Sequence, residues 1–314
     1  MTPLDPQAKA LLTAMIAAAH PPLKEMTVEN ARSLIETTAE QLDLPVKKVG
    51  SIKEMPIPGP GGELPLRIYT PPGQGPFPVI LFFHGGGWVL YRPKHYDSHC
   101  THLCSGTSSI IISVDYRRSP ETKFPGPLDD CFAALNWVNE HASEIGGDPD
   151  KIIVCGDSAG GNLAAGLTLK NRDVKGPALL AQVLIYPAIA WYEPPTHSFL
   201  EYADGYSLTR EALVWFWDQY LTSRDQSFHP YAVPMNAGNF GGLPEALIVV
   251  AGYDPLRDEG ISYAARLQKE GIPVTLMNFE GLIHGFLSFL GILDQSTRAF
   301  EQICEWLKQR IEKP

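Results

Sequence analysis

The segment KIIVCGDSAGG, residues 151–161, joins an apolar run that suits a β-strand to a G-x-S-x-G motif. The next residues, NLAAGLTLKN at 162–171, have the composition of a helix. At so tight a strand-to-helix turn the serine is pushed out of the sheet, and the flanking glycines remove Cβ clashes from the strained backbone. The dipole and free amides of the helix then lie beside any anion that forms there. The motif predicts that Ser158 is a nucleophile.

Apolar runs of this kind alternate with helical patterns along most of the chain. Several runs are almost continuously apolar, which is typical of parallel strands covered by helices on both faces. The pattern predicts an α/β fold with a mostly parallel central sheet of about eight strands. The strand candidates are an early run within residues 48–55 and runs that begin at Arg67, Pro78, Ser109, Lys151, Ala181, Ala246 and Pro273.

Two segments interrupt the alternation of strands and helices. Residues 1–47 predict two helices, the second being TVENARSLIETTAEQL at 27–42, and residues 188–228 contain many aromatic residues and one helical pattern. We expect both segments to form a helical cap over one edge of the sheet. The predicted organisation is a cap segment at 1–47, the catalytic α/β domain at 48–187 and 229–314, and a cap insertion at 188–228.

Composition limits the partners of the protein. The 314 residues carry a formal net charge of −10 and contain no cluster of lysines and arginines, which argues against binding to nucleic acid or to an anionic membrane. The apolar run KALLTAMIAAAH at 9–20 is too short to span a bilayer and lacks the positive flank of a signal peptide. Five sparse cysteines, an odd number, do not suggest a disulfide framework. We expect a cytoplasmic protein.

A serine nucleophile needs a general base, and the base needs an acid that orients it. On a sheet of this type the chain order is serine, acid, histidine. The run ALIVVAG is followed by YDPLRDEG, which offers Asp254, Asp258 and Glu259. Asp254 is favoured because it comes first after the strand, whereas Asp258 suits the start of the next helix. The base is predicted to be His284, since no other histidine follows Asp254.

The motif HGGGW at residues 84–88 directly follows the apolar run PVILFF. Glycine amides can point at a substrate oxygen because no side chain blocks them, and HGGG loops form oxyanion holes in lipases and esterases. The predicted N–H donors are those of Gly85, Gly86 and Ala159, and each donor can contribute ~10²–10³ to the rate. His84 is expected to brace the loop, because it precedes the serine in the chain.

With these residues in place, the chain resembles the hormone-sensitive-lipase-like esterases, the HGGG group of α/β-hydrolases. The motifs HGGGW, DYRRSPETKFP, GDSAGG, DPLRDEG and HGF occur in the order of the family. The resemblance implies a triad of Ser158, Asp254 and His284, hydrolysis of short to medium acyl esters and no cofactor. It also implies a homodimer, which is common in the family.

Two positions depart from the family pattern. Arg118 and Ser119 replace an apolar pair, and Tyr91 replaces a frequent glycine after HGGGWVL. These departures bear on the shape of the entrance to the active site, and not on the hydrolytic chemistry.

The predicted substrate pocket contains Trp88, Asp157 and Trp215. A second cluster, His95, His99 and His102, would share one face of a helix and resembles a metal site. Because no carboxylate or further cysteine pair completes a closed ligand shell, we expect no metal there.

The leading hypothesis is therefore a serine carboxylesterase that acts on a small-molecule ester through an acyl-enzyme. An amidase or lactonase would use the same nucleophile and the same anion, so the sequence does not separate these activities. A non-catalytic receptor on a hydrolase fold is disfavoured, since such receptors lose the histidine and this chain keeps all three triad residues.

Overall fold

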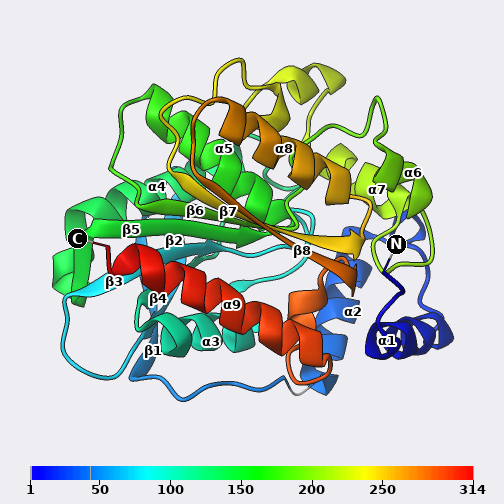
Figure 1. The fold of residues 1–314 in the computed structure, drawn as a ribbon, viewed down its shortest axis with the longest axis horizontal. Helices are drawn as coiled ribbons and strands as arrows, with labels where there is room; N and C mark the ends of the chain where they lie inside the picture. The colour runs from blue at the N-terminus through cyan, green and yellow to red at the C-terminus, as the bar shows by residue number, and fades with distance from the viewer. Residues whose placement is uncertain (1, 43, 314) are drawn as a thin grey trace.

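The apolar runs form one eight-stranded sheet in the computed structural model, which describes residues 2–42 and 44–313 (Figure 1). The strand order is β1-β2-β4-β3-β5-β6-β7-β8. Strand β2 is antiparallel to both β1 and β4, and the strands from β4 to β8 pair in parallel. The predicted mostly parallel sheet is confirmed. The strands are β1 (Ser51–Gly59), β2 (Gly62–Thr70), β3 (Phe77–Phe83), β4 (Ile110–Val114), β5 (Gly147–Asp157), β6 (Ala181–Ile185), β7 (Glu245–Tyr253) and β8 (Val274–Ile283).

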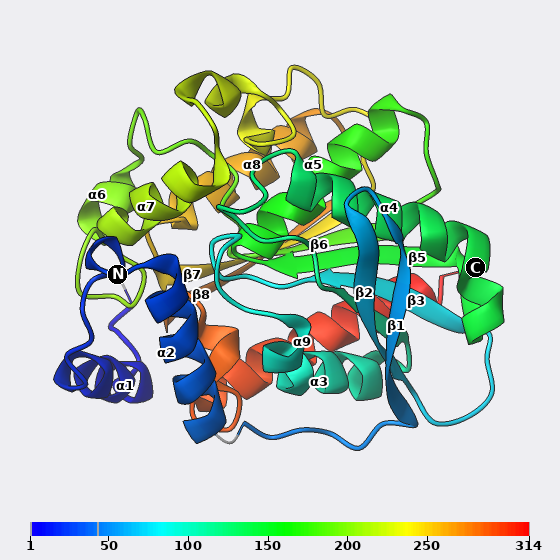
Figure 2. The same ribbon diagram turned by 180° about the vertical axis from the view of Figure 1, so that it is seen from behind.

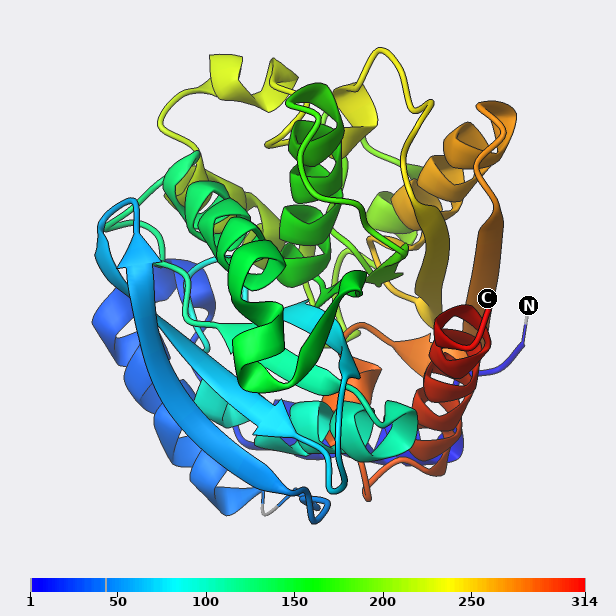
Figure 3. The same ribbon diagram turned by 90° about the vertical axis from the view of Figure 1, so that its left-hand side faces the viewer.

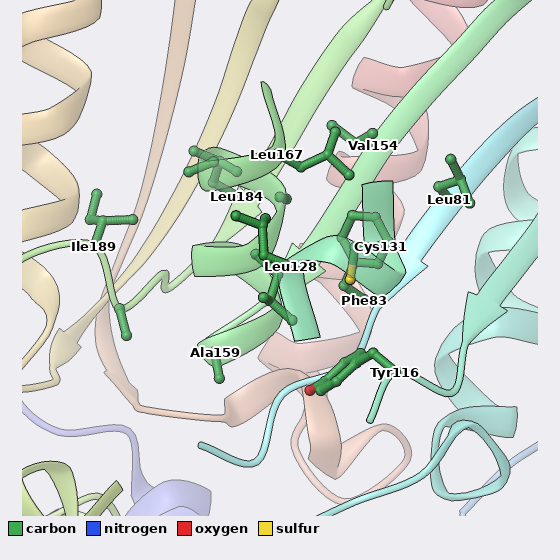
Figure 4. Packing of buried hydrophobic residues seen from close by; sticks show 14 of the residues in the cluster. Leu81, Phe83, Tyr116, Leu128, Cys131, Val154, Ala159, Leu167, Leu184 and Ile189 are labelled. Atoms are coloured by element: carbon green, nitrogen blue, oxygen red, sulfur yellow. The ribbon is translucent and has the colours of Figure 1, made fainter. Parts of the chain in front are cut away.

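Helices cover both faces of this sheet (Figures 1 and 3). One face carries α4 (Gly126–His141), α5 (Ala159–Asp173) and α8 (Arg257–Lys269), and the other carries α3 (Asp97–Thr107) and α9 (Asp294–Ile311). Figure 4 shows Leu128 of α4 and Leu167 of α5 packed among Leu81, Val154 and Leu184 of the strands. All five side chains are at most 1% exposed, and burial of each stabilises the fold by about 1.5–3 kcal/mol.

Four further helices gather beyond the carboxyl ends of the parallel strands (Figures 1 and 2). They are α1 (Pro6–Ala17), α2 (Val28–Gln41), α6 (His197–Glu201) and α7 (Arg210–Tyr220). Side chains set where they begin, because Asp5 accepts the N–H of Gln7 at α1 and Thr209 accepts the N–H of Ala212 at α7. The short turn η1 (Leu23–Glu25) packs against α7. The N-terminal segment and the insertion therefore lie side by side.

The five cysteines are free thiols, and all of them are buried. Burial raises the pKa of each thiol, which keeps the groups protonated and apolar in character. Within residues 2–42 and 44–313, no helix has the length and apolar character needed to cross a membrane.

Candidate active site

Ser158 occupies a sharp turn between β5 and α5. Its backbone has φ +54° and ψ −116°, a conformation that a serine adopts only under strain of about 1–3 kcal/mol. The N–H of Ser158 donates to the carbonyl of Ile185 in β6 over 2.8 Å, which ties the turn to the next strand. A Cβ at Gly160 would lie 1.8 Å from the carbonyl oxygen of Phe83, so only glycine lets α5 approach β3 this closely.

The structure brings Ser158, His284 and Asp254 into one hydrogen-bonded row. Nε2 of His284 lies 3.0 Å from Oγ of Ser158, and its Nδ1 lies 2.7 Å from Oδ2 of Asp254. Asp254 follows β7, is fully buried, and accepts the N–H of Leu256 with its other oxygen over 2.8 Å. A carboxylate in this place holds the proton on Nδ1, so Nε2 is free to accept the serine proton.

The two other candidates for the triad acid, Asp258 and Glu259, accept hydrogen bonds from backbone N–H groups of the insertion. Asp258 accepts the N–H of Ser198 at the start of α6 over 2.8 Å, and Glu259 accepts the N–H groups of Ile189 and Ala190 over 2.7 and 3.2 Å. The structure therefore places neither carboxylate against the histidine. It also buries Glu259 to 4% exposure, although the sequence RDE has the composition of a solvated surface.

This burial predicts a pH-dependent stability. Burial raises the pKa of Glu259 to about 8, with a smaller contribution to this rise from the neighbouring Asp254 and Asp258. The folded protein keeps a proton that the unfolded chain has already released, so the stabilisation is complete below the pKa of the unfolded glutamate and is lost as the pH rises through about 8. The loss is at most about 1.4 kcal/mol per pH unit.

Glu259→Gln keeps the hydrogen-bond acceptor without the titration. We expect its melting temperature to change less between about pH 6 and pH 9 than that of the unmodified protein, as measured by scanning calorimetry. Glu63→Gln, at an exposed position near the start of β2, is the matched control and should keep the original slope. Parallel slopes for all three proteins would contradict the assignment.

The glycine loop corrects one part of the predicted oxyanion hole. The N–H of Gly85 donates to Oδ1 of Asp157 over 2.8 Å and lies 3.0 Å from Oη of Tyr96, so it points into the protein. No hydrogen bond within the described part of the chain engages the N–H groups of Gly86, Gly87 or Ala159. Gly87 was missed by sequence reasoning, although three adjacent glycines offered it as an equal candidate.

His84 supports this loop from below. Its Nδ1 lies 2.9 Å from the carbonyl oxygen of Gly85, and its ring stacks on Tyr116 at 4.4 Å. Burial lowers the pKa of His84 to about 3, so the imidazole is neutral. These contacts agree with the expectation that His84 braces the loop.

The predicted pocket residues have other surroundings than expected. Trp88 is 1% exposed and stacks on Tyr220 of α7 at 4.2 Å, so it belongs to the core and not to a pocket wall. Asp157 lies buried beneath the glycine loop. Only Trp215 is half-buried, on α7, where its ring contacts Phe216 edge-on. A bulky aromatic residue next to a catalytic loop can pack in the core or line a pocket, and sequence composition does not distinguish these two environments.

A cavity of about 300 Å³ lies near the carboxyl end of α7, and no triad side chain lines it. Its walls include Trp191, Trp217 and Arg224.

Arg118 and Tyr91, two of the residues that depart from the family pattern, contact the glycine loop or the segment that follows it. The guanidinium of Arg118 donates to the carbonyls of Leu90 and Tyr91. From α2, Arg32 donates to the carbonyl of Val89 over 2.9 Å. The Tyr91 ring packs so close to Gly86 that a Cβ there would lie 2.5 Å from it.

The histidine cluster has no metal-binding geometry. The ring of His99 is buried between Tyr96 and Phe300, and His102 contacts the carbonyl of Ser98 through Nδ1 at 2.7 Å. Among the residues that the structure describes, no three His, Cys, Asp or Glu side chains could hold a metal ion together.

Several known proteins that are similar to this chain are esterases. A family described by the alpha/beta hydrolase fold matches residues 80–288. The esterase LipI of Mycobacterium tuberculosis is 39% identical over 273 residues, 84% of this chain and 85% of its own length. The arylesterase of Saccharolobus solfataricus is 35% identical and covers 91% of this chain and 92% of its own. The hyperthermophilic esterase of Pyrobaculum calidifontis superimposes with a TM-score of 0.94 at 36% identity, over 98% of this chain and 99% of its own.

Proposed function

This chain belongs to the α/β-hydrolase family as a hormone-sensitive-lipase-like carboxylic ester hydrolase, and from that premise we propose that Ser158, His284 and Asp254 are its catalytic triad. The observation that carries the proposal is the imidazole of His284, which lies within hydrogen-bond distance of both the serine hydroxyl and the aspartate. Such a row activates a hydroxyl that is otherwise a weak nucleophile.

In the proposed mechanism, Oγ of Ser158 attacks the ester carbonyl while Nε2 of His284 takes the serine proton. Asp254 stabilises the imidazolium that forms. The tetrahedral oxyanion accepts hydrogen bonds from the N–H groups of Gly86, Gly87 and Ala159. The imidazolium then protonates the leaving alcohol, and a water molecule that His284 deprotonates releases the acid from the acyl-enzyme.

We also propose that residues 1–47 and 188–228 act together as the cap. The ion pair between Lys24 and Glu211 joins them, and Arg224 pairs with Glu193 within the insertion over 2.6 Å. Charged residues interrupt the aromatic residues of the insertion throughout, which suits a fixed wall better than a lid that opens onto a lipid surface. A cytoplasmic location and a homodimer stay predictions.

A fixed wall predicts a limited acyl chain length. Each methylene that fits the pocket should add about 0.8 kcal/mol of transition-state binding until the pocket ends. We expect the highest kcat/KM on short to medium acyl chains and little activity on long ones. The measurement is a series of aryl esters from acetate to palmitate, each followed from below to above its solubility limit. A rate that climbs up to palmitate, or that jumps when the substrate forms an emulsion, would contradict the closed pocket.

The function itself is tested with a fluorophosphonate probe and a substrate panel. The probe should label Ser158, as located by mass spectrometry, and Ser158→Ala should stay unlabelled. The rates on esters, amides and lactones with the same acyl group are then compared, and we expect esters to be hydrolysed fastest. Absence of labelling in a folded protein would contradict the triad and favour a receptor.

A further inference from the structure

A buried carboxylate lies directly beneath the glycine loop. Asp157 is 3% exposed, and its Oδ1 accepts the N–H of Gly85 over 2.8 Å. Its Oδ2 accepts the phenol O–H of Tyr96 over 3.1 Å, and that phenol oxygen also lies 3.0 Å from the Gly85 nitrogen. Tyr96 ends the short turn η2 (Pro93–Tyr96) and is itself buried. The three groups form a closed triangle without exposed members.

We propose that Asp157 and Tyr96 are positioning residues for the oxyanion hole, which they orient by holding the Gly85 N–H inward. The proposal rests on the proposed function, because it assigns a task within the same reaction. Neither side chain is assigned a contact with the substrate.

The geometry of the backbone explains how one hydrogen bond can orient two others. Gly86 and Gly87 have φ of +94° and +60°, so the chain turns sharply after Gly85. With the Gly85 N–H fixed toward Asp157, rotation of the loop as a unit is blocked. The two following N–H groups, which have no partner in the described part of the chain, keep a constant direction.

The Gly85 backbone and the Asp157 carboxylate are in direct contact. A Cβ at Gly85 would lie 2.7 Å from Oδ2 of Asp157 and 3.0 Å from Oη of Tyr96. No side chain and no water fits between the loop and the carboxylate. Asp157 directly precedes Ser158, so the carboxylate that contacts the glycine loop belongs to the residue next to the proposed nucleophile.

The carboxylate costs the fold more than a neutral group would. Burial raises the pKa of Asp157 to about 7, and within the described residues its carboxylate accepts hydrogen bonds from the Gly85 N–H and the Tyr96 O–H, with no ion pair to a lysine or arginine. An ordinary structural acceptor could be an amide at lower cost. The titratable groups that interact electrostatically with Asp157 are Tyr91, Tyr96, Tyr116, Cys155, Tyr186 and His284. Of these groups, only His284 becomes a cation, and it does so during the reaction.

The experiment compares Asp157→Ala, Asp157→Asn and Tyr96→Phe with the unmodified enzyme. We expect kcat on an aryl acetate to fall about 100-fold in Asp157→Ala and about tenfold in the other two, with KM changed less than about threefold, because only stabilisation of developing charge is lost. Asparagine retains an oxygen that can accept the Gly85 N–H, so it should rescue part of the loss.

A second readout separates orientation of the oxyanion hole from general structural support. A trifluoromethyl ketone forms a tetrahedral oxyanion on the serine, so its inhibition constant should rise in parallel with the loss of kcat/KM. Asp130→Asn is the matched control, since Asp130 is a buried carboxylate on α4 that pairs with Arg117 at 2.8 Å, away from the triad. It should lower the melting temperature and leave kcat and the inhibition constant unchanged.

The outcomes distinguish this proposal from the proposed function. If Ser158→Ala is inactive while Asp157→Asn and Tyr96→Phe keep full kcat and inhibitor affinity, the positioning role is wrong and the triad stands. If KM alone rises, Asp157 contributes to the substrate pocket and the proposal fails. If Ser158→Ala keeps its activity, the triad itself is wrong. Should Asp157→Ala not fold, the two conservative variants decide.

Discussion

Replacement of Ser158 by alanine is expected to lower kcat on an aryl acetate by about 10⁴- to 10⁶-fold, with the fold intact. In the proposed mechanism the Ser158 hydroxyl forms the acyl-enzyme, and neither His284 nor Asp254 takes over as the nucleophile. The small change of side chain at an already strained turn should leave the melting temperature within a few degrees. The residual rate should be that of the oxyanion hole and substrate binding alone. The measurement is initial-rate kinetics together with thermal unfolding.

The other triad variants test whether the row acts as one unit. His284→Ala should cost about as much as Ser158→Ala, and the double variant should be no slower than either one. Asp254→Asn should lose about 10⁴-fold, because the amide favours the wrong tautomer of the imidazole. Asp258→Asn is the matched control and should retain near-normal turnover. The acid assignment is wrong if Asp258→Asn loses activity and Asp254→Asn does not.

Replacement of Gly86 by alanine is the second large effect that we expect. The residue has φ +94°, and a Cβ there would lie 2.5 Å from the Tyr91 ring, so the loop must shift. Because one hydrogen-bond donor to the oxyanion is worth about 10²–10³ in kcat, we expect a loss of that size with a much smaller change in KM. Initial-rate kinetics on the same aryl acetate separate the change in kcat from the change in KM.

Gly62→Ala provides the control for backbone strain. Gly62 has φ +115° at the start of β2, and a Cβ there would have no atom within 4 Å, so alanine adds backbone strain without a new side-chain contact. It should lower the melting temperature and keep kcat. If Gly86→Ala behaves in the same way, the glycines only shape a turn and the donors lie elsewhere.

The sheet, and the carboxylate that lies beside His284, could be predicted from the sequence. Parallel strands buried on both faces must be almost continuously apolar, so each strand from β3 to β8 stands out against its neighbours. A residue that directly follows such a strand reaches the carboxyl edge of the sheet, which separated Asp254 from Asp258 correctly in space. The catalytic roles themselves stay a prediction until the variants are measured.

The sequence could not show the direction of individual groups. The spacing HGGG does not say which way each peptide plane faces, so only the contact with Asp157 distinguishes Gly85 from Gly87. Trp88 was expected in the pocket, and the sequence could not place it in the core because its packing depends on α7, more than 120 residues later. The burial of Glu259 likewise depends on residues of another segment.

The contacts between the two proposed cap segments and the sheet constrain how this protein can be recombined with its relatives. Arg32 binds the segment after the glycines, Trp88 stacks on Tyr220, and Glu259 holds the first residues of the insertion. A chimera with crossovers at residues 47, 188 and 228 would separate each of these pairs. An exchange that also carries positions 88, 89 and 259 from the donor preserves these three pairs, and it is the smallest graft for which we expect an ordered glycine loop.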